Sequence, residues 1–193
     1  VTGVQTCALP ISLVERIEAA VGPGGLPGAQ LAIGRAGEVV FERSFGAAAP
    51  ESRFVVFSAT KPVVASAVWA LLGEGRIDLA TRIAEVVPEF APNGKDGITL
   101  EQVLLHTAGF PHAPMGIADW DDRHRRLARF AAWRCNWEPG TRFEYHATSA
   151  HWVLAEVIER LTGEDFRRHL RRRVLDPLGL TRFELGVPPE RQG

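Results

Sequence analysis

The chain has 193 residues, 46% of them hydrophobic, and a formal net charge of −1 at pH 7. This length and composition are sufficient for one or two globular domains with a hydrophobic core, and no apolar run approaches the roughly 18 residues that cross a bilayer. The near-neutral charge speaks against nucleic acid or a membrane surface as a partner, because both attract a clear basic excess.

The two ends of the chain are unusual. Residues 1–12, VTGVQTCALPIS, match the translation of a common sequencing-adapter oligonucleotide, so we expect them to be an artefact. They lack the basic start and apolar stretch of a signal peptide. The chain ends in GVPPERQG without a closing element, which predicts a gene fragment broken at both ends. The compartment is therefore left open, with the cytoplasm slightly favoured over the periplasm.

The N-terminal part predicts a helix and a hairpin. Apolar residues at helical spacing predict an amphipathic helix from Leu13 to Val21, and the turn GPGGLPG ends it. Residues 29–46 are rich in β-branched and aromatic residues and predict two strands joined by a short turn near Ala36 and Gly37.

The rest of the chain predicts helices. A long helix follows Ser58 and ends at Gly73 and Gly75. Further helices are predicted within the stretches 78–90, 99–110, 119–133, 149–162 and 166–175. One hairpin followed by many helices indicates an α+β fold whose sheet has few strands. The basic runs 123–129 and 167–173 are predicted to be solvated helix faces, because their interleaved leucines mark the opposite face.

Ser58 and Lys61 form an S-x-x-K pair at the start of the long helix. Side chains at i and i+3 share a helix face, with Cβ atoms about 5–6 Å apart, so Lys61 can reach the hydroxyl of Ser58. Pro62 is tolerated in the first turn of a helix, which places the helix start at or just before it. Ser58 then lies where free backbone N–H groups favour developing negative charge. The alternative is that Ser58 caps the helix and Lys61 is solvated.

Five segments carry a resemblance to a known superfamily. They are SATK (58–61), LLHTAGFP (104–111), EPGTRFEYH (138–146), AHWVLAEVIERLTG (150–163) and LDPLGLTRFELG (175–186). In this order they resemble the serine β-lactamase-related hydrolases: class C β-lactamases, D-Ala-D-Ala carboxypeptidases and family VIII carboxylesterases. The resemblance implies a β-lactamase/transpeptidase-like fold, with an antiparallel sheet packed by helices and a helical subdomain. Residues 13–193 would be part of that domain, with the helix and hairpin in 13–57 and the helical region in 58–186.

The resemblance also implies roles for three residues. Ser58 is similar to the acylated nucleophile, and Lys61 to its paired base or electrostatic partner. Tyr145, the only tyrosine of the chain, is similar to the tyrosine of the family's Y-x-N motif, which relays a proton to the leaving group. A phenol beside an ammonium is held partly as phenolate and can then act near neutral pH. The alternative is that Tyr145 is a buried aromatic residue whose hydroxyl finds a structural partner.

Substrate-binding candidates are Ala147, His146 and Trp137. Ala147 stands where the family has an asparagine that binds the substrate's amide, so recognition of a β-lactam or peptide is less expected. His146 or His151 could partly replace that asparagine, but they point to different helix faces and do not predict a metal site. Core packing is the alternative for Trp137.

Two further residues have structural expectations. His106 is expected to hold a loop through hydrogen bonds. Cys135 is expected to be a buried thiol. With Cys7, it makes too few cysteines for a disulfide framework or a zinc site, so no metal or other cofactor is predicted.

These residues together predict a serine hydrolase that acts on a small-molecule ester through an acyl-enzyme on Ser58. A β-lactamase or D,D-carboxypeptidase is the alternative enzyme, and a non-catalytic binding protein or inactive fragment is the alternative of another class. The family's later K-T-G or H-x-G strand, which supplies an oxyanion N–H, is absent from the chain. Loss of one such donor costs on the order of a hundred-fold, so we expect little turnover from these 193 residues. The oligomeric state is left open.

Overall fold

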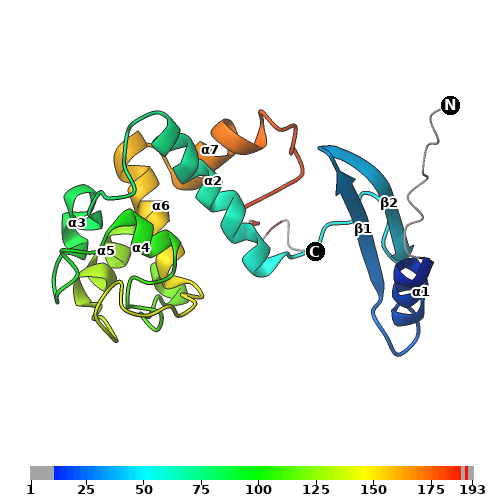
Figure 1. The fold of residues 1–193 in the computed structure, drawn as a ribbon, viewed down its shortest axis with the longest axis horizontal. Helices are drawn as coiled ribbons and strands as arrows, with labels where there is room; N and C mark the ends of the chain where they lie inside the picture. Colours follow the sequence, from blue (N-terminus) through cyan, green and yellow to red (C-terminus); the bar gives the residue numbers. More distant parts are fainter. Residues whose placement is uncertain (1–10, 188–189, 191–193) are drawn as a thin grey trace. The chain divides into compact units, whose positions relative to one another are not determined.

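The computed structural model describes residues 11–187 and residue 190, and the chain divides into two compact units between Val55 and Val56. Residues 1–10, most of the expected artefact, lie outside the described residues. The described part combines a two-stranded antiparallel sheet with helices (Figure 1). The predicted α+β class is therefore confirmed.

The first unit holds a helix and a hairpin, as the sequence predicts. Its elements are α1 (Ile11–Ala20), β1 (Gly28–Arg35) and β2 (Glu38–Gly46). The strands pair antiparallel, and the turn between them places Ala36 and Gly37 at positive φ, 51° and 85°. Two left-handed residues match the right-handed twist of a hairpin, which explains the turn at this point. Glu18 on α1 accepts a hydrogen bond from Arg43 on β2 at 2.7 Å.

The second unit consists of helices and helical turns. They are, in chain order, η1 (Phe57–Ala59), α2 (Thr60–Gly73), α3 (Ile83–Val86), η2 (Pro88–Phe90), α4 (Leu100–Leu104), η3 (Ile117–Asp119), α5 (Arg123–Ala132), α6 (Ser149–Thr162), α7 (Phe166–Leu170) and the π-helical turn η4 (Arg171–Leu175). Helix α6 runs through the middle of this unit and packs against α2, α3, α4 and α7 (Figure 1).

Several of the predicted helices differ in their bounds, and the one within 99–110 ends already at Leu104. The stretch 78–90 contains only α3 and the short turn η2, because Pro88 lacks the N–H that would continue the helix. The polar helix begins at Arg123 rather than at Asp119, because the carboxylate of Asp122 accepts a hydrogen bond from the N–H of Arg125 at 3.1 Å and caps it there. The helix predicted within 166–175 changes from α to π geometry at Arg171.

The core of the second unit is apolar and centred on α6. Its buried side chains on that helix include Val153, Leu154, Val157 and Ile158, all with 0% exposure. An aromatic cluster lies beside them: the ring centroids of Phe90 and Phe110 are 5.4 Å apart and meet edge to face. Phe130 and Trp133 extend this cluster. Such burial is the main stabilising contribution to the unit.

The prediction that residues 123–129 form a solvated helix face is wrong in part. The run 123–129 was expected to be a solvated face, but Arg126 is only 6% exposed and pairs with Glu159 at 3.2 Å. The side chain of Glu156 is fully buried and accepts hydrogen bonds from Arg123 at 2.6 Å and Arg160 at 2.8 Å. The acidic residues of α6 thus neutralise cations of α5, and buried charges need such partners.

Candidate active site

Ser58 lies in the turn η1, directly before α2, and its side chain contacts Lys61. The ammonium of Lys61 donates a hydrogen bond to Oγ of Ser58 at 3.0 Å. Pro62 occupies the first turn of α2, as predicted. Neither η1 nor α2 has a side-chain cap, so the alternative in which Ser58 serves as a helix cap does not hold. The hydroxyl is exposed beside the amine.

The residue before the serine has a strained backbone. Phe57 has a φ of 44°, in the left-handed region that non-glycine residues rarely adopt. Such a conformation costs about 1–3 kcal/mol and persists only where the surrounding structure enforces it. The bend leads the chain into the first turn of α2 and presents Ser58 at its start. The sequence carried no signal of this strain.

Tyr145 lies beside the same pair, although it is far away in the sequence. The ammonium of Lys61 lies 5.0 Å from the centroid of the tyrosine ring. Hydrogen bonding to Lys61, and then to Ser58, lowers the pKa of Tyr145 below its usual value of about 10. The side chain is 46% exposed, so it is not the buried aromatic residue of the alternative interpretation. The fold therefore brings Ser58, Lys61 and Tyr145 together.

His146 has a structural place in the core. It has 0% exposure, and its Nε2 accepts a hydrogen bond from the N–H of Phe110 at 3.1 Å. Its Nδ1 lies 2.7 Å from the carbonyl oxygen of Glu144, to which it donates. Burial lowers the pKa of His146, which keeps the ring neutral. With both ring nitrogens engaged, His146 is not available to a substrate, which corrects the prediction that it binds one.

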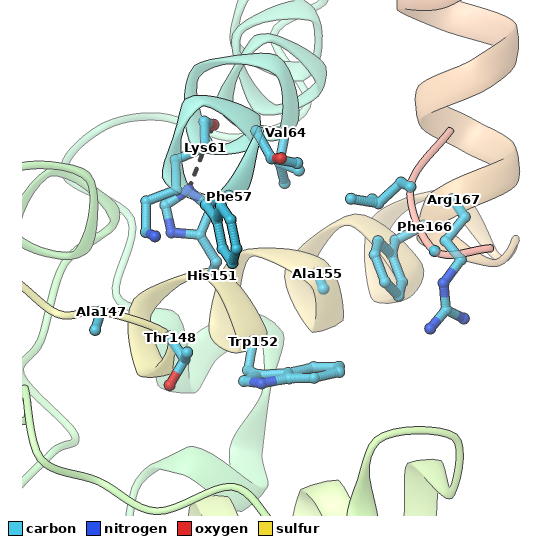
Figure 2. Close-up of a pocket in the computed structure, with 13 residues that line it drawn as sticks. Phe57, Lys61, Val64, Ala147, Thr148, His151, Trp152, Ala155, Phe166 and Arg167 are labelled. Atoms are coloured by element: carbon cyan, nitrogen blue, oxygen red, sulfur yellow. Dashed lines mark hydrogen bonds between the residues drawn. The ribbon is translucent and has the colours of Figure 1, made fainter. Parts of the chain in front are cut away.

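A mostly apolar pocket of about 280 Å³ opens beside Lys61. In Figure 2, Ala147 and Thr148 lie at one side of it and Phe166 and Arg167 at the other. Its other lining residues are Phe57, Thr60, Val64, His151, Trp152, Ala155, Leu185 and Gly186. Ala147 thus faces a cavity next to the amine. The sequence had not pointed to the apolar residues around it.

Trp137 does not line this pocket. It is half-buried, its ring centroid lies 6.3 Å from that of His146, and the guanidinium of Arg142 lies 4.9 Å from its centroid. These contacts fit the packing alternative for Trp137.

Cys135 is half-buried, and burial raises the pKa of its thiol, in keeping with an inert side chain.

His151 joins α6 to the start of α2. Its Nε2 lies 3.4 Å from the backbone oxygen of Lys61, and because a carbonyl only accepts, Nε2 carries the proton (Figure 2). Its Nδ1 is buried without a hydrogen-bond partner among the described residues. Burial lowers the pKa of His151 to about 4, so the ring is neutral at pH 7. Within the described part of the chain, no cluster of three His, Cys, Asp or Glu residues could hold a metal ion.

The chain has a β-lactamase/transpeptidase-like fold, with the hairpin in its first unit and the S-x-x-K helix in its second. The family model described as Beta-lactamase matches residues 13–193, and the chain belongs to this family.

Curated relatives include two esterases. The chain is 30% identical over 200 residues to Esterase EstB of Burkholderia gladioli, covering 88% of this chain and 50% of that protein. It is 31% identical over 143 residues to Esterase/beta-lactamase LipL of Mycobacterium tuberculosis, covering 72% of this chain and 32% of that protein. The chain therefore spans about a third to a half of the length of these relatives.

Solved structures with the same fold carry both esterase and penicillin-binding titles. A novel penicillin-binding protein homologue from Caulobacter crescentus matches with a TM-score of 0.76 and 31% identity, over 93% of this chain and 51% of that one. A family VIII carboxylesterase matches with a TM-score of 0.64 and 34% identity, over 69% of this chain and 38% of that one. Among the described residues, no helix is both long and apolar enough to span a membrane.

Proposed function

We propose that the protein hydrolyses carboxylic esters through an acyl-enzyme formed on Ser58. The observation that carries the proposal is the 3.0 Å contact between Nζ of Lys61 and Oγ of Ser58, with the ring centroid of Tyr145 5.0 Å from the same Nζ. A serine hydroxyl is a weak nucleophile until a neighbour takes its proton. Here two ionisable neighbours converge on one exposed hydroxyl at a helix start.

The roles of the two neighbours follow from their charges. Lys61 donates its hydrogen bond to Ser58, so its ammonium stabilises negative charge near the hydroxyl. Tyr145, whose pKa is lowered by this ammonium and by Ser58, is the better proton acceptor in its phenolate form. Lys61 therefore acts as electrostatic partner and Tyr145 as general base.

The reaction then proceeds in two stages. Oγ of Ser58 forms a bond to the ester carbonyl carbon while its proton passes to Tyr145, and the alcohol leaves with that proton. Water next attacks the acyl carbon of acyl-Ser58 and gives a proton to the same phenolate. The acyl–Oγ bond then breaks and Tyr145 returns this proton to Oγ, which releases the carboxylic acid and restores the hydroxyl of Ser58 and the phenolate. The start of α2 favours the negative charge that develops on the carbonyl oxygen.

Three observations favour an ester over an amide. Ala147 borders the pocket with a methyl group, which cannot hydrogen-bond an amide. The pocket is mostly apolar, as a site for an acyl or alcohol group would be. The names of EstB and of the family VIII carboxylesterase point to the same class of substrate. Alcohols also need less protonation than amines to leave.

A β-lactamase or D,D-carboxypeptidase is the second candidate. The penicillin-binding title of the Caulobacter homologue and the double name of LipL support it. The same acylation of Ser58 would open a lactam or cleave a peptide, but without an amide-reading side chain at Ala147. A binding protein without catalysis is the alternative from another class.

The test compares substrates on the full-length product of the gene that encodes these residues. We expect hydrolysis of a chromogenic short-chain ester to exceed that of a chromogenic cephalosporin, and a fluorophosphonate probe to label Ser58. Turnover of the cephalosporin alone would replace the esterase proposal by the lactamase one. A folded product that neither hydrolyses the ester nor takes the label would be a binding protein.

A further inference from the structure

The segment that carries Tyr145 has no regular structure of its own. Residues 142–146, between α5 and α6, are neither helix nor strand. A catalytic group on such a segment needs contacts that fix its backbone, since misplacement by about 1 Å can cost a hundred-fold in rate. The hydrogen bonds on either side of Tyr145 therefore decide where its phenol lies.

Both of these bonds end on a single residue, His106. The N–H of Glu144 donates to the backbone oxygen of His106 at 3.2 Å. The N–H of His146 donates to the ring Nδ1 of His106 at 3.1 Å. The imidazole ring also lies against the phenol, with centroids 5.0 Å apart. One residue thus accepts from the N–H groups of both neighbours of Tyr145 and contacts its ring.

His106 adopts a strained conformation to make these contacts. Its φ is 59°, in the left-handed region, where residues other than glycine are uncommon. Strain of this kind persists only when the surroundings enforce it, and it clusters at functional sites. In this conformation the carbonyl and the ring of His106 both face the segment of Tyr145.

The loop after His106 is hydrogen-bonded both to this segment and to the residues before it. The N–H of Asn136 donates to the oxygen of Gly109 at 2.7 Å, and the N–H of Phe110 donates to Nε2 of His146. Gly109 has a φ of 84°, and a Cβ there would lie 2.6 Å from the oxygen of Trp137. Only glycine allows this approach. The loop is therefore a rigid support for His106.

The acceptor role of His106 requires a neutral ring. Burial, and then electrostatic interaction with His146 and Lys61, lower the pKa of His106, which keeps the ring neutral at pH 7. Because the N–H of His146 donates to Nδ1, the proton of the neutral ring lies on Nε2. Among the described residues, the ionisable side chains of Lys61 and His106 both lie against the tyrosine ring.

We propose that His106 is a positioning residue for Tyr145: it accepts hydrogen bonds from the backbone N–H groups of the residues before and after the tyrosine and so holds the phenol beside Lys61 and Ser58. The inference rests on the proposed function, in which Tyr145 takes the proton of Ser58. It assigns a role to a residue that does not itself touch the reacting atoms.

Two substitutions separate the acceptor from the backbone strain. His106→Asn keeps an oxygen acceptor near the place of Nδ1, and asparagine tolerates positive φ. His106→Gly relieves the φ but removes the acceptor. We expect His106→Gly to lower kcat for the ester about 10- to 100-fold with little change in KM, and His106→Asn to retain most of kcat.

A spectroscopic readout does not depend on turnover. Tyr145 is the only tyrosine of these 193 residues, and Tyr145→Phe identifies its ring-carbon NMR signal in the full-length product. We expect the midpoint of this signal's pH titration to lie below about 10 in the wild type and in His106→Asn, and to rise toward 10 in His106→Gly.

Asn93→Gly is the matched control. Asn93 also has a positive φ, 65°, and its side chain donates to the backbone oxygens of Ala131 and Trp133. It should lose stability comparably and leave the tyrosine titration and kcat unchanged. An unmoved tyrosine titration in His106→Gly, or an equal effect of Asn93→Gly, overturns the positioning role. Absence of label on Ser58 overturns the proposed function instead, so the two failures are distinguishable.

Discussion

Nε2 of His151 donates a hydrogen bond to the backbone oxygen of Lys61, at 3.4 Å, and so ties the central helix α6 to the first turn of α2. The bond holds the backbone from which the amine reaches Ser58. It requires a neutral or doubly protonated ring with a proton on Nε2, and burial strongly favours the neutral form. The stability of the helical unit should therefore depend on pH.

The free energy of unfolding is expected to fall as the pH is lowered from 6.5 to 4. The pKa of His151 is about 4 in the folded protein and about 6.5 in an unfolded chain, so the unfolded chain binds the proton more tightly over this range. Stability thus rises with pH, and His151 contributes about 2 kcal/mol to the difference between pH 8 and pH 5. Urea unfolding at a series of pH values measures it. His151→Gln, which cannot titrate, should flatten the slope; an unchanged slope would contradict this assignment.

Removing any of the three converging side chains should abolish most activity without unfolding the protein. Ser58→Ala should lose probe labelling and ester hydrolysis. Lys61→Met and Tyr145→Phe should each lower kcat about 100- to 10,000-fold. Changes in stability should stay under about 1 kcal/mol for Ser58→Ala and Tyr145→Phe, because both side chains are exposed.

The control for Ser58→Ala is a serine of the same helix. Ser66 on α2 donates to the oxygen of Val63 at 2.6 Å, away from the site. Ser66→Ala should keep both the label and the ester activity. Activity retained in Tyr145→Phe, with kcat near the wild-type value, would show that another group takes the proton.

Substitution of Ala147 should change the preference between esters and amides. Ala147 is exposed and borders the pocket beside Lys61, so Ala147→Asn can be accommodated and adds an amide there. We expect the ratio of cephalosporin to ester hydrolysis to rise about 10-fold, which corresponds to one additional hydrogen bond of about 1.4 kcal/mol. Ala147→Leu adds similar bulk without the amide and should slow both substrates. An equal ratio in the two variants would rule out an amide-reading role at this position.

Glu156→Gln should destabilise the helical unit by about 2 kcal/mol. The carboxylate is fully buried and accepts from Arg123 and Arg160, and hydrogen bonds to charged groups are worth more than neutral ones. Urea unfolding measures the loss. Asp176→Asn is the control, because the pair of Asp176 with Arg171 is exposed and should contribute less than about 1 kcal/mol. Equal losses in both variants would contradict a special role of the buried carboxylate.

Local features of the fold were accessible from the sequence. The hairpin with its turn at Ala36 and Gly37, and the approximate places of the helices, follow from side-chain periodicity and turn chemistry, which act over a few residues. Bounds were missed where a single residue overrode the periodicity, as Asp122 did by capping α5. The solvated face predicted for 123–129 was wrong at Arg126, because its partner Glu159 lies on another helix.

For the site, the sequence by itself determined the contact between Ser58 and Lys61, since an i, i+3 spacing at a helix start leaves the two side chains on one face. It named Tyr145 through a resemblance and not through spacing. Only the tertiary structure placed that phenol against Lys61, buried His146 with both nitrogens engaged, and set the contacts of His106 on either side of Tyr145. The physical reason is that these contacts join segments far apart in the chain, and their geometry depends on how the whole helical core packs around α6.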